Sequence, residues 1–176
     1  MDISIDEFCR LSESDKCKYI QNFSILYAQQ FSRQDLDDYC FLSDACRAIH
    51  KTAKGATILA GLLPHCMVLN FFVQPSSRTF LSFGAAEAIL GMKRMSLRDV
   101  RISSMSKGES LQDSLRTFIS YVDLVVMRHG DEKASDVAFW ISMQSHRTID
   151  CNGTEHPIPI ISGGSGSKQH PTQALL

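Results

Sequence analysis

The sequence predicts an α/β fold with an open parallel sheet flanked by helices, and two observations lead to this class. Residues 66–73 and 122–127 are apolar almost throughout, which is typical of strands that are buried on both faces. Segments of helical length and periodicity follow these runs. This alternation of strands and helices favours a parallel sheet, because two parallel strands need a crossover element between them.

Residues 1–31 are predicted to form a helical extension ahead of the sheet domain, which would span residues 32–176. Ser14 is placed to cap a helix whose apolar side carries Tyr19, Ile20, Phe23 and Tyr27. A second helix is expected to begin at Ser32, since Asp35 stands three residues later as a capping-box partner. Its apolar face would carry Leu36, Cys40, Ala45 and Ile49.

From residue 66 onward the expected elements alternate in type. The strand at 66–73 is broken by Pro75, and the helix after it ends at Gly91. Ser110 is expected to open the next helix. The remaining expected elements are a strand at 122–127, a helix around 137–141, and a short strand at 158–161 that leads into a glycine-rich turn.

The composition is that of an ordinary globular domain and argues against several functional classes. The chain has 176 residues, of which 44% are hydrophobic and 21% charged, and a formal net charge of -1. No overall positive charge favours nucleic acid or an anionic membrane. The N-terminus lacks the features of a signal peptide, and no apolar stretch approaches the roughly 20 residues that span a bilayer. We therefore expect a cytoplasmic protein with neither nucleic acid nor membrane as a partner.

Metal and cofactor sites are not indicated by the sequence. The six cysteines are scattered without a C-x-x-C pair, and Cys151, His146 and His156 lack the spacing of zinc ligands. The segment at 163–168 has no glycine directly before its lysine and no hydroxyl residue after it, so it is not a phosphate-binding P-loop. Reduced thiols, no metal and no cofactor are expected.

Three polar clusters follow directly after predicted strands: Ser76–Thr79, Arg128–His129 and Gly163–Gln173. Ligands bind at the carboxyl ends of the strands of an open parallel sheet, so these clusters are predicted to form one site. Hydroxyl residues ahead of a helix gather backbone N–H groups and the positive end of the helix dipole, and Arg78 adds a planar charge suited to phosphate. The sequence thus indicates an anion site.

Each cluster by itself also has an ordinary structural explanation. An N-cap followed by a surface arginine explains Ser76–Thr79 equally well. Arg128 could satisfy carbonyl groups, and a lone histidine such as His170 is more often structural. The segment Ser103–Ser110 is most simply a solvated loop. Their combination is what favours a functional site.

Four segments, taken together, resemble the transcarbamoylase family. They are Pro75–Thr79 with Leu81–Phe83, Lys107–Ser110, Tyr121–His129 and Gln169–Gln173. They occur in the order and with the spacing of that family, from about residue 66 to the end. The second half of this pattern is more similar to the aspartate than to the ornithine carbamoyltransferases.

The resemblance implies a fold and a set of site residues. The fold would be an open parallel four-stranded sheet, the carbamoyl-phosphate-binding half of a two-domain protein. The phosphate would be held by Ser76, Ser77, Arg78 and Thr79. The carbonyl oxygen would be polarised by Thr79, Arg128 and His170, and Gln173 would accept from the carbamoyl amino group. The implied catalytic residues are Arg78, Thr79, Arg128 and His170. Ser103 and Lys107 would reach a neighbouring subunit's site, which implies a homotrimer with shared active sites.

The implied reaction transfers the carbamoyl group of carbamoyl phosphate to the amine of L-aspartate, in pyrimidine biosynthesis and without a cofactor. Gln74, Phe80 and Gly84 replace the usual acidic residue, arginine and glutamate of the family. The chain ends at Leu176, inside the helix expected to lead to an aspartate-binding domain. Three alternatives stay open: a non-catalytic subunit with a regulatory or assembly role, another amine such as ornithine as acceptor, and a separate aspartate-binding domain or regulatory subunit as partner.

Overall fold

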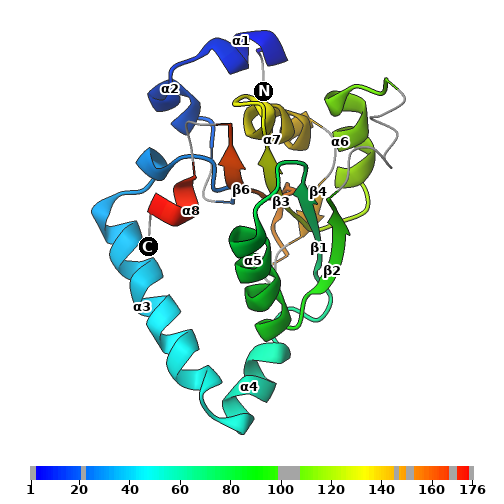
Figure 1. Cartoon of the computed structure of the whole chain (residues 1–176). Coiled ribbons are helices and arrows are strands. Elements are labelled where there is room, and N and C mark those ends of the chain that lie inside the picture. Colours follow the sequence, from blue (N-terminus) through cyan, green and yellow to red (C-terminus); the bar gives the residue numbers. More distant parts are fainter. Residues whose placement is uncertain are drawn as a thin grey trace.

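The computed structural model describes residues 3–20, 23–98, 108–144, 147–149, 153–166 and 170–174. Its centre is a sheet of four parallel strands in the order β2-β1-β3-β6 (Figure 1). The strands are β1 (Met67–Phe72), β2 (Lys93–Leu97), β3 (Leu124–His129) and β6 (Ile160–Ser165). The predicted open parallel four-stranded sheet is confirmed.

Helices precede the sheet and connect its strands. They are α1 (Ile5–Arg10), α2 (Glu13–Cys17), the 3-10 helix η1 (Ala28–Gln30), α3 (Arg33–His50), α4 (Ala53–Ala60), α5 (Ser77–Ile89), α6 (Leu111–Ile119), α7 (Ala134–Gln144) and α8 (Pro171–Ala174). Two short strands, β4 (Arg147–Ile149) and β5 (Glu155–Pro157), pair antiparallel between α7 and β6. Among the described helices, none is long and apolar enough to cross a membrane.

The apolar runs of β1 and β3 occupy the middle of the sheet because their side chains are buried on both faces. Successive strand residues point to opposite faces. Phe71 and Met127 accordingly belong to one core cluster, together with side chains of α6 and α7. Phe72 and Val126 belong to a second cluster, against Phe80 and other side chains of α5. The helix after β1 ends as predicted near Gly91, whose φ of 78° favours glycine.

The N-terminal segment packs into the same core. Phe8 of α1 is fully buried, and its ring centroid lies 5.7 Å from that of Phe139 on α7. Ile25 extends the sheet beside β6: its N–H donates to Ile160 O at 2.8 Å, and its carbonyl accepts from Ser162 N at 2.7 Å. The division of the chain between residues 31 and 32 stays a prediction.

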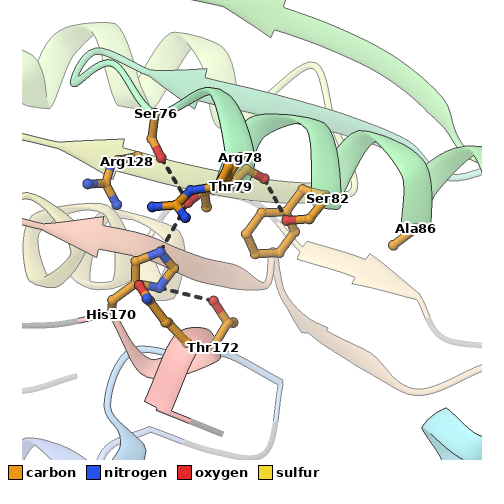
Figure 2. Close-up of a pocket in the computed structure, with 10 residues that line it drawn as sticks. Ser76, Arg78, Thr79, Ser82, Ala86, Arg128, His170 and Thr172 are labelled. Atoms are coloured by element: carbon orange, nitrogen blue, oxygen red, sulfur yellow. Dashed lines mark hydrogen bonds between the residues drawn. The ribbon is translucent and has the colours of Figure 1, made fainter. Parts of the chain in front are cut away.

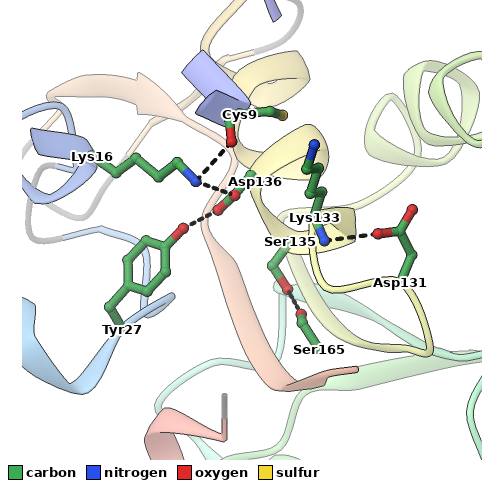
Figure 3. Close-up of polar contacts among 8 residues, drawn as sticks. All are labelled: Cys9, Lys16, Tyr27, Asp131, Lys133, Ser135, Asp136 and Ser165. Atoms are coloured by element: carbon green, nitrogen blue, oxygen red, sulfur yellow. Dashed lines mark hydrogen bonds and ion pairs between the residues drawn. The ribbon is translucent and has the colours of Figure 1, made fainter. Parts of the chain in front are cut away.

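A buried polar cluster joins this N-terminal segment to α7 (Figure 3). Lys16 Nζ lies 2.7 Å from Asp136 Oδ2 and also donates to Cys9 O at 3.3 Å. The Tyr27 hydroxyl donates to the other oxygen of Asp136. Burial and the adjacent Asp136 carboxylate hold the pKa of Tyr27 well above its usual range. The tyrosine therefore acts only as a donor here.

One prediction for the N-terminal helices is wrong in detail. The helix expected from Ser14 is short, because Ser12 caps it by accepting from Asp15 N and it already ends at Cys17. The capping box of Ser32 and Asp35 is present at the start of α3. None of the residues of α3 is buried, so its predicted apolar face does not pack on the sheet. Figure 1 shows α3 leading away from the sheet and the chain returning through α4.

Neither β2, nor α4, nor the β4–β5 pair was predicted from the sequence. β2 is an edge strand, and Lys93, Arg94, Met95 and Ser96 are exposed along it. An exposed edge strand has no apolar run, so its pattern is not visible in the sequence.

Candidate functional site

A cavity of about 590 Å³ opens at the carboxyl ends of the central strands (Figure 2). Its walls come from the first turns of α5, the end of β3 and α8. The lining residues are Ser76, Arg78, Thr79, Ser82, Phe83, Ala86, Arg128, His170, Thr172 and Gln173. Two of these are arginines and none is an Asp or Glu, so the cavity favours an anion.

The start of α5 forms one wall of the cavity. Ser76 is its N-cap residue, but the serine side chain makes no cap hydrogen bond to the helix. Instead Ser76 Oγ donates to Thr79 Oγ1 at 2.9 Å, across one helical turn. An ordinary N-cap would use its oxygen to accept from a backbone N–H of the first turn. The backbone N–H groups of the first turn of α5 are therefore not satisfied by the cap residue. They lie close to Arg78 in the sequence and can donate to an anion.

Arg128, at the end of β3, connects the three segments that surround the cavity. Its carbonyl accepts from Val73 N at 2.9 Å and from Gln74 N at 3.2 Å, which anchors the chain that leads into α5. Its Nη1 donates to Gly163 O at 2.7 Å, at the end of β6. Its Nε is buried without a hydrogen-bond partner among the described residues. A buried guanidinium N–H without a partner is costly, so this arginine is suited to an additional acceptor.

The two glycines near the end of β6 bring this strand close to Arg128. Gly164 has a φ of 120°, and a Cβ on it would lie 2.3 Å from Arg128 Nη1 and 3.5 Å from His170 Cδ2. Only glycine fits both the backbone conformation and the space. This end of β6 therefore places Arg128 and His170 against the same cavity.

His170 lies between two hydroxyl groups. Its Nε2 is 3.2 Å from Thr79 Oγ1 and its Nδ1 is 3.3 Å from Thr172 Oγ1 (Figure 2). Burial lowers the pKa of His170, and the positive charge of Arg128 lowers it further. The neutral imidazole is thus the form that this site favours near neutral pH.

Two positions where the sequence departs from the transcarbamoylase pattern, Gln74 and Phe80, flank Ser76–Thr79 in the sequence and do not line the cavity. Gln74 Oε1 is buried and has no hydrogen-bond partner among the described residues. The Phe80 ring packs edge-on against Phe72 at 5.3 Å between centroids, and the guanidinium carbon of Arg98 lies 4.4 Å from the Phe80 centroid. A cation is therefore held over the ring at this point.

Comparison with known proteins agrees with this geometry. The sequence model for the carbamoyl-P binding domain of aspartate/ornithine carbamoyltransferase matches residues 24–176. The chain belongs to the aspartate/ornithine carbamoyltransferase family.

Its similarity to individual carbamoyltransferases covers most of this chain but a smaller part of theirs. The aspartate carbamoyltransferase catalytic subunit of Clostridium novyi is 35% identical over 156 residues, which is 89% of this chain and 44% of that protein. The multifunctional protein pyr-3 of Neurospora crassa is 36% identical over 152 residues, 86% of this chain and 7% of that protein. The chain thus spans less than half the length of these relatives.

Solved structures of the family have the same fold. Aspartate transcarbamoylase from Trypanosoma cruzi in complex with carbamoyl phosphate has a TM-score of 0.73 at 34% identity, over 89% of this chain and 45% of that chain. The complex of the same enzyme with carbamoyl aspartate and phosphate has a TM-score of 0.72 at 34% identity, over 89% and 43%.

The structure brings together most of the residues that the sequence singled out. Ser76, Arg78, Thr79, Arg128, His170 and Gln173 all line the cavity of this carbamoyltransferase domain. Ser77 is exposed at the first position of α5 and does not line it. Ser103 and Lys107 lie outside the described residues, as do Cys151 and His146. No group of three or more potential metal ligands occurs within the described residues.

Four lining residues were missed by the sequence reasoning: Ser82, Phe83, Ala86 and Thr172. The first three follow Thr79 by three, four and seven residues, so they share its face of α5. Helical spacing from Thr79 was a signal that could have found them. For Thr172 the only indication in the sequence was its position two residues after His170.

Proposed function

We propose that this chain binds carbamoyl phosphate as one half of an aspartate carbamoyltransferase. The reaction would transfer the carbamoyl group to the amine of L-aspartate and release N-carbamoyl-L-aspartate and phosphate. The observation that carries the proposal is the convergence of Arg78, Arg128, the Ser76 and Thr79 hydroxyls and His170 on one cavity without carboxylates. The complexes of the Trypanosoma cruzi enzyme with carbamoyl phosphate and with carbamoyl aspartate support it.

The phosphate would bind at the start of α5. Ser76, Ser77, Arg78 and Thr79 offer hydroxyl, guanidinium and backbone N–H donors to its oxygens, and the helix dipole favours its negative charge. The carbamoyl carbonyl would extend toward Thr79, Arg128 and His170, and its amino group toward Gln173. Arg128 lines the cavity, so its guanidinium would be available to this end of the ligand.

Catalysis would follow from positioning and electrostatics. The neutral amine nitrogen would attack the carbamoyl carbon, and negative charge would grow on the carbonyl oxygen. The bond from carbon to the phosphate oxygen would then break as the C=O bond re-forms, and the nitrogen would lose a proton to the departing phosphate. Donors aimed at the carbonyl oxygen stabilise the charged intermediate most strongly when they are already in place before the reaction. Arg128 is held in place by its bond to Gly163 O, and His170 by its two hydroxyl neighbours.

A complete enzyme would need more than this site. The proposal includes a homotrimer in which Ser103 and Lys107 complete a neighbour's site, and a domain or subunit that binds aspartate. It also includes the division of the chain at residue 32 and a cytoplasmic setting. The family membership of residues 24–176 and the length of the relatives, more than twice that of this chain, support a further aspartate-binding part. The division at residue 32, the trimer and the cytoplasmic setting rest on the sequence and on its resemblance to the family.

A non-catalytic subunit with a regulatory or assembly role is the second candidate. One observation favours it: Gln74 stands where the family usually has an acidic residue, and its buried Oε1 has no partner among the described residues. Against it, the arginines, hydroxyls and histidine of the cavity form a site that a purely structural subunit does not need.

Isothermal titration with carbamoyl phosphate and with phosphate tests the proposal. We expect saturable binding by the chain, loss of binding for Arg78→Ala, and no change for Arg47→Ala, which removes an exposed arginine of α3 outside the cavity. Light scattering should accompany the titration, because a monomer would lack a neighbour's Lys107. A folded trimer that binds neither ligand would refute the catalytic proposal and support the regulatory one.

A further inference from the structure

His170 and its neighbours form a continuous chain of hydrogen-bonding groups from one side of the cavity to the other (Figure 2). Ser76 Oγ donates to Thr79 Oγ1 at 2.9 Å. Thr79 Oγ1 lies 3.2 Å from His170 Nε2, and His170 Nδ1 lies 3.3 Å from Thr172 Oγ1. Each hydroxyl has one proton to donate, and a neutral imidazole has one N–H and one acceptor nitrogen. The directions of these bonds are therefore linked.

Only two arrangements of protons satisfy this chain when His170 is neutral. In the first, Thr79 donates to Nε2, and the N–H on Nδ1 donates to Thr172. In the second, Thr172 donates to Nδ1, and the N–H on Nε2 points toward Thr79 and the cavity. In the first arrangement the Thr79 hydroxyl donates its proton to His170, so neither Thr79 nor His170 Nε2 can donate to a ligand. The second leaves the Thr79 proton free.

A ligand that places a carbonyl oxygen in this cavity is compatible with only one of the two arrangements. Its oxygen needs a donor, which is either the Thr79 hydroxyl or the Nε2–H of His170. Both choices require the tautomer with the proton on Nε2. In that tautomer Nδ1 is an acceptor, and Thr172 Oγ1 is the side-chain donor that the structure places beside it.

We propose that Thr172 is a positioning residue that holds His170 in the Nε2–H tautomer, so that the Thr79–His170 pair can donate to the carbonyl oxygen of the ligand. The inference rests on the proposed function, because it needs a carbonyl-bearing ligand in the cavity. Thr172 acts through His170, since its hydroxyl lies on the nitrogen opposite to the one that meets Thr79. The burial of His170 and the charge of Arg128, which lower the pKa of the imidazole, favour the neutral ring that this arrangement requires.

The test compares two ligands that differ in the carbonyl group. Phosphonoacetamide carries a phosphonate and a carbonyl and resists hydrolysis, whereas inorganic phosphate lacks the carbonyl. We expect Thr172→Val, which keeps the shape and removes the donor, to weaken phosphonoacetamide binding about tenfold by leaving Nδ1 unsatisfied, and to leave phosphate binding nearly unchanged. Thr172→Ser should bind like the unmodified chain.

The tautomer is read directly from the ¹⁵N chemical shifts of the imidazole nitrogens. The chain has six histidines, and His170→Asn identifies the signals of His170. Thr117→Val is the matched control, because Thr117 is an exposed threonine of α6 outside the cavity. With phosphonoacetamide bound, we expect His170 of the unmodified chain to be in the Nε2–H form, and the two tautomers to mix in Thr172→Val. Circular dichroism checks that every variant is folded.

Three outcomes decide the inference. A selective loss of phosphonoacetamide binding in Thr172→Val, with the tautomer change, supports it. Equal affinities of Thr172→Val and the unmodified chain for both ligands, or an Nδ1–H histidine in the complex, overturn it. If the unmodified chain is a folded trimer and binds neither ligand, the proposed function fails instead. The ligand-free spectra then decide: unchanged His170 shifts in Thr172→Val overturn the inference, and changed shifts absent from Thr117→Val support the contact.

Discussion

Replacing Gly164 by alanine would show whether the end of β6 holds Arg128 in its place. The glycine has a φ of 120°, and an added Cβ would lie 2.3 Å from Arg128 Nη1 and 3.1 Å from its Cζ. Ordinary contact needs about 3.5 Å, so the guanidinium must retreat by roughly 1 Å. That movement breaks its 2.7 Å hydrogen bond to Gly163 O.

The expected magnitude has two parts. The positive φ strains an alanine by about 1–3 kcal/mol, and the lost charge-assisted hydrogen bond costs about 1.5–3 kcal/mol. We therefore expect the free energy of unfolding of Gly164→Ala to fall by about 3–5 kcal/mol. The affinity for carbamoyl phosphate should fall roughly 10- to 100-fold, since the displaced arginine loses one charge-assisted contact with the ligand.

Urea unfolding and isothermal titration measure these two quantities, with Gly153→Ala as the matched control. Gly153 has a φ of 79°, but nothing lies within 4 Å of its added Cβ, so the alanine is strained without a clash. Gly153→Ala should lose about 1–3 kcal/mol of stability and no affinity. Equal effects of the two substitutions on both quantities would refute the role of the close approach to Arg128.

Three further substitutions test other contacts of the fold. Lys16→Met leaves the Asp136 carboxylate buried with Tyr27 alone, so urea unfolding should show a loss of about 3 kcal/mol, and adding Asp136→Asn should recover part of it. Phe8→Ala should lose about 3–5 kcal/mol in the same assay, because its ring is fully buried against Phe139; a loss below about 1 kcal/mol would mean that α1 is not part of the core. Burial raises the pKa of Glu87 above its ordinary value of 4.5, so the folded protein keeps this proton to a higher pH than the unfolded chain. The free energy of unfolding of the protein should therefore fall as the pH rises through and above 4.5. Glu87→Gln should remove that fall in unfolding curves recorded across this pH range, and an unchanged pH dependence would contradict the assignment.

The central part of the fold could be predicted because its signals are local. The apolar runs that became β1 and β3 are buried on both faces, and the Ser32 and Ser110 caps begin α3 and α6 as expected. β2 has no such signal, since its side chains are mostly exposed at the sheet edge. The apolar face of α3 was visible in the sequence, but its exposure in the structure was not.

The part of the site that lies near the carboxyl ends of the strands could be predicted from the sequence. Arg128 lies at the end of β3, Ser76–Thr79 and His170 follow β1 and β6, and parallel strands bring their carboxyl ends to one edge. The wall formed by Ser82, Phe83 and Ala86 was not predicted, because these residues lie one to two helical turns beyond the polar cluster at Ser76–Thr79.

The sequence by itself determined the class of the fold, its central strands and the polar groups available at their ends, because periodicity and capping depend on residues a few positions apart. The tertiary structure alone decided which of those groups meet. The ion pair of Lys16 and Asp136 joins residues 120 positions apart, the contact between Thr79 and His170 spans 91 positions, and Arg128 reaches Gly163 across 35. Such pairs depend on how the whole chain packs, and no local pattern in the sequence encodes them.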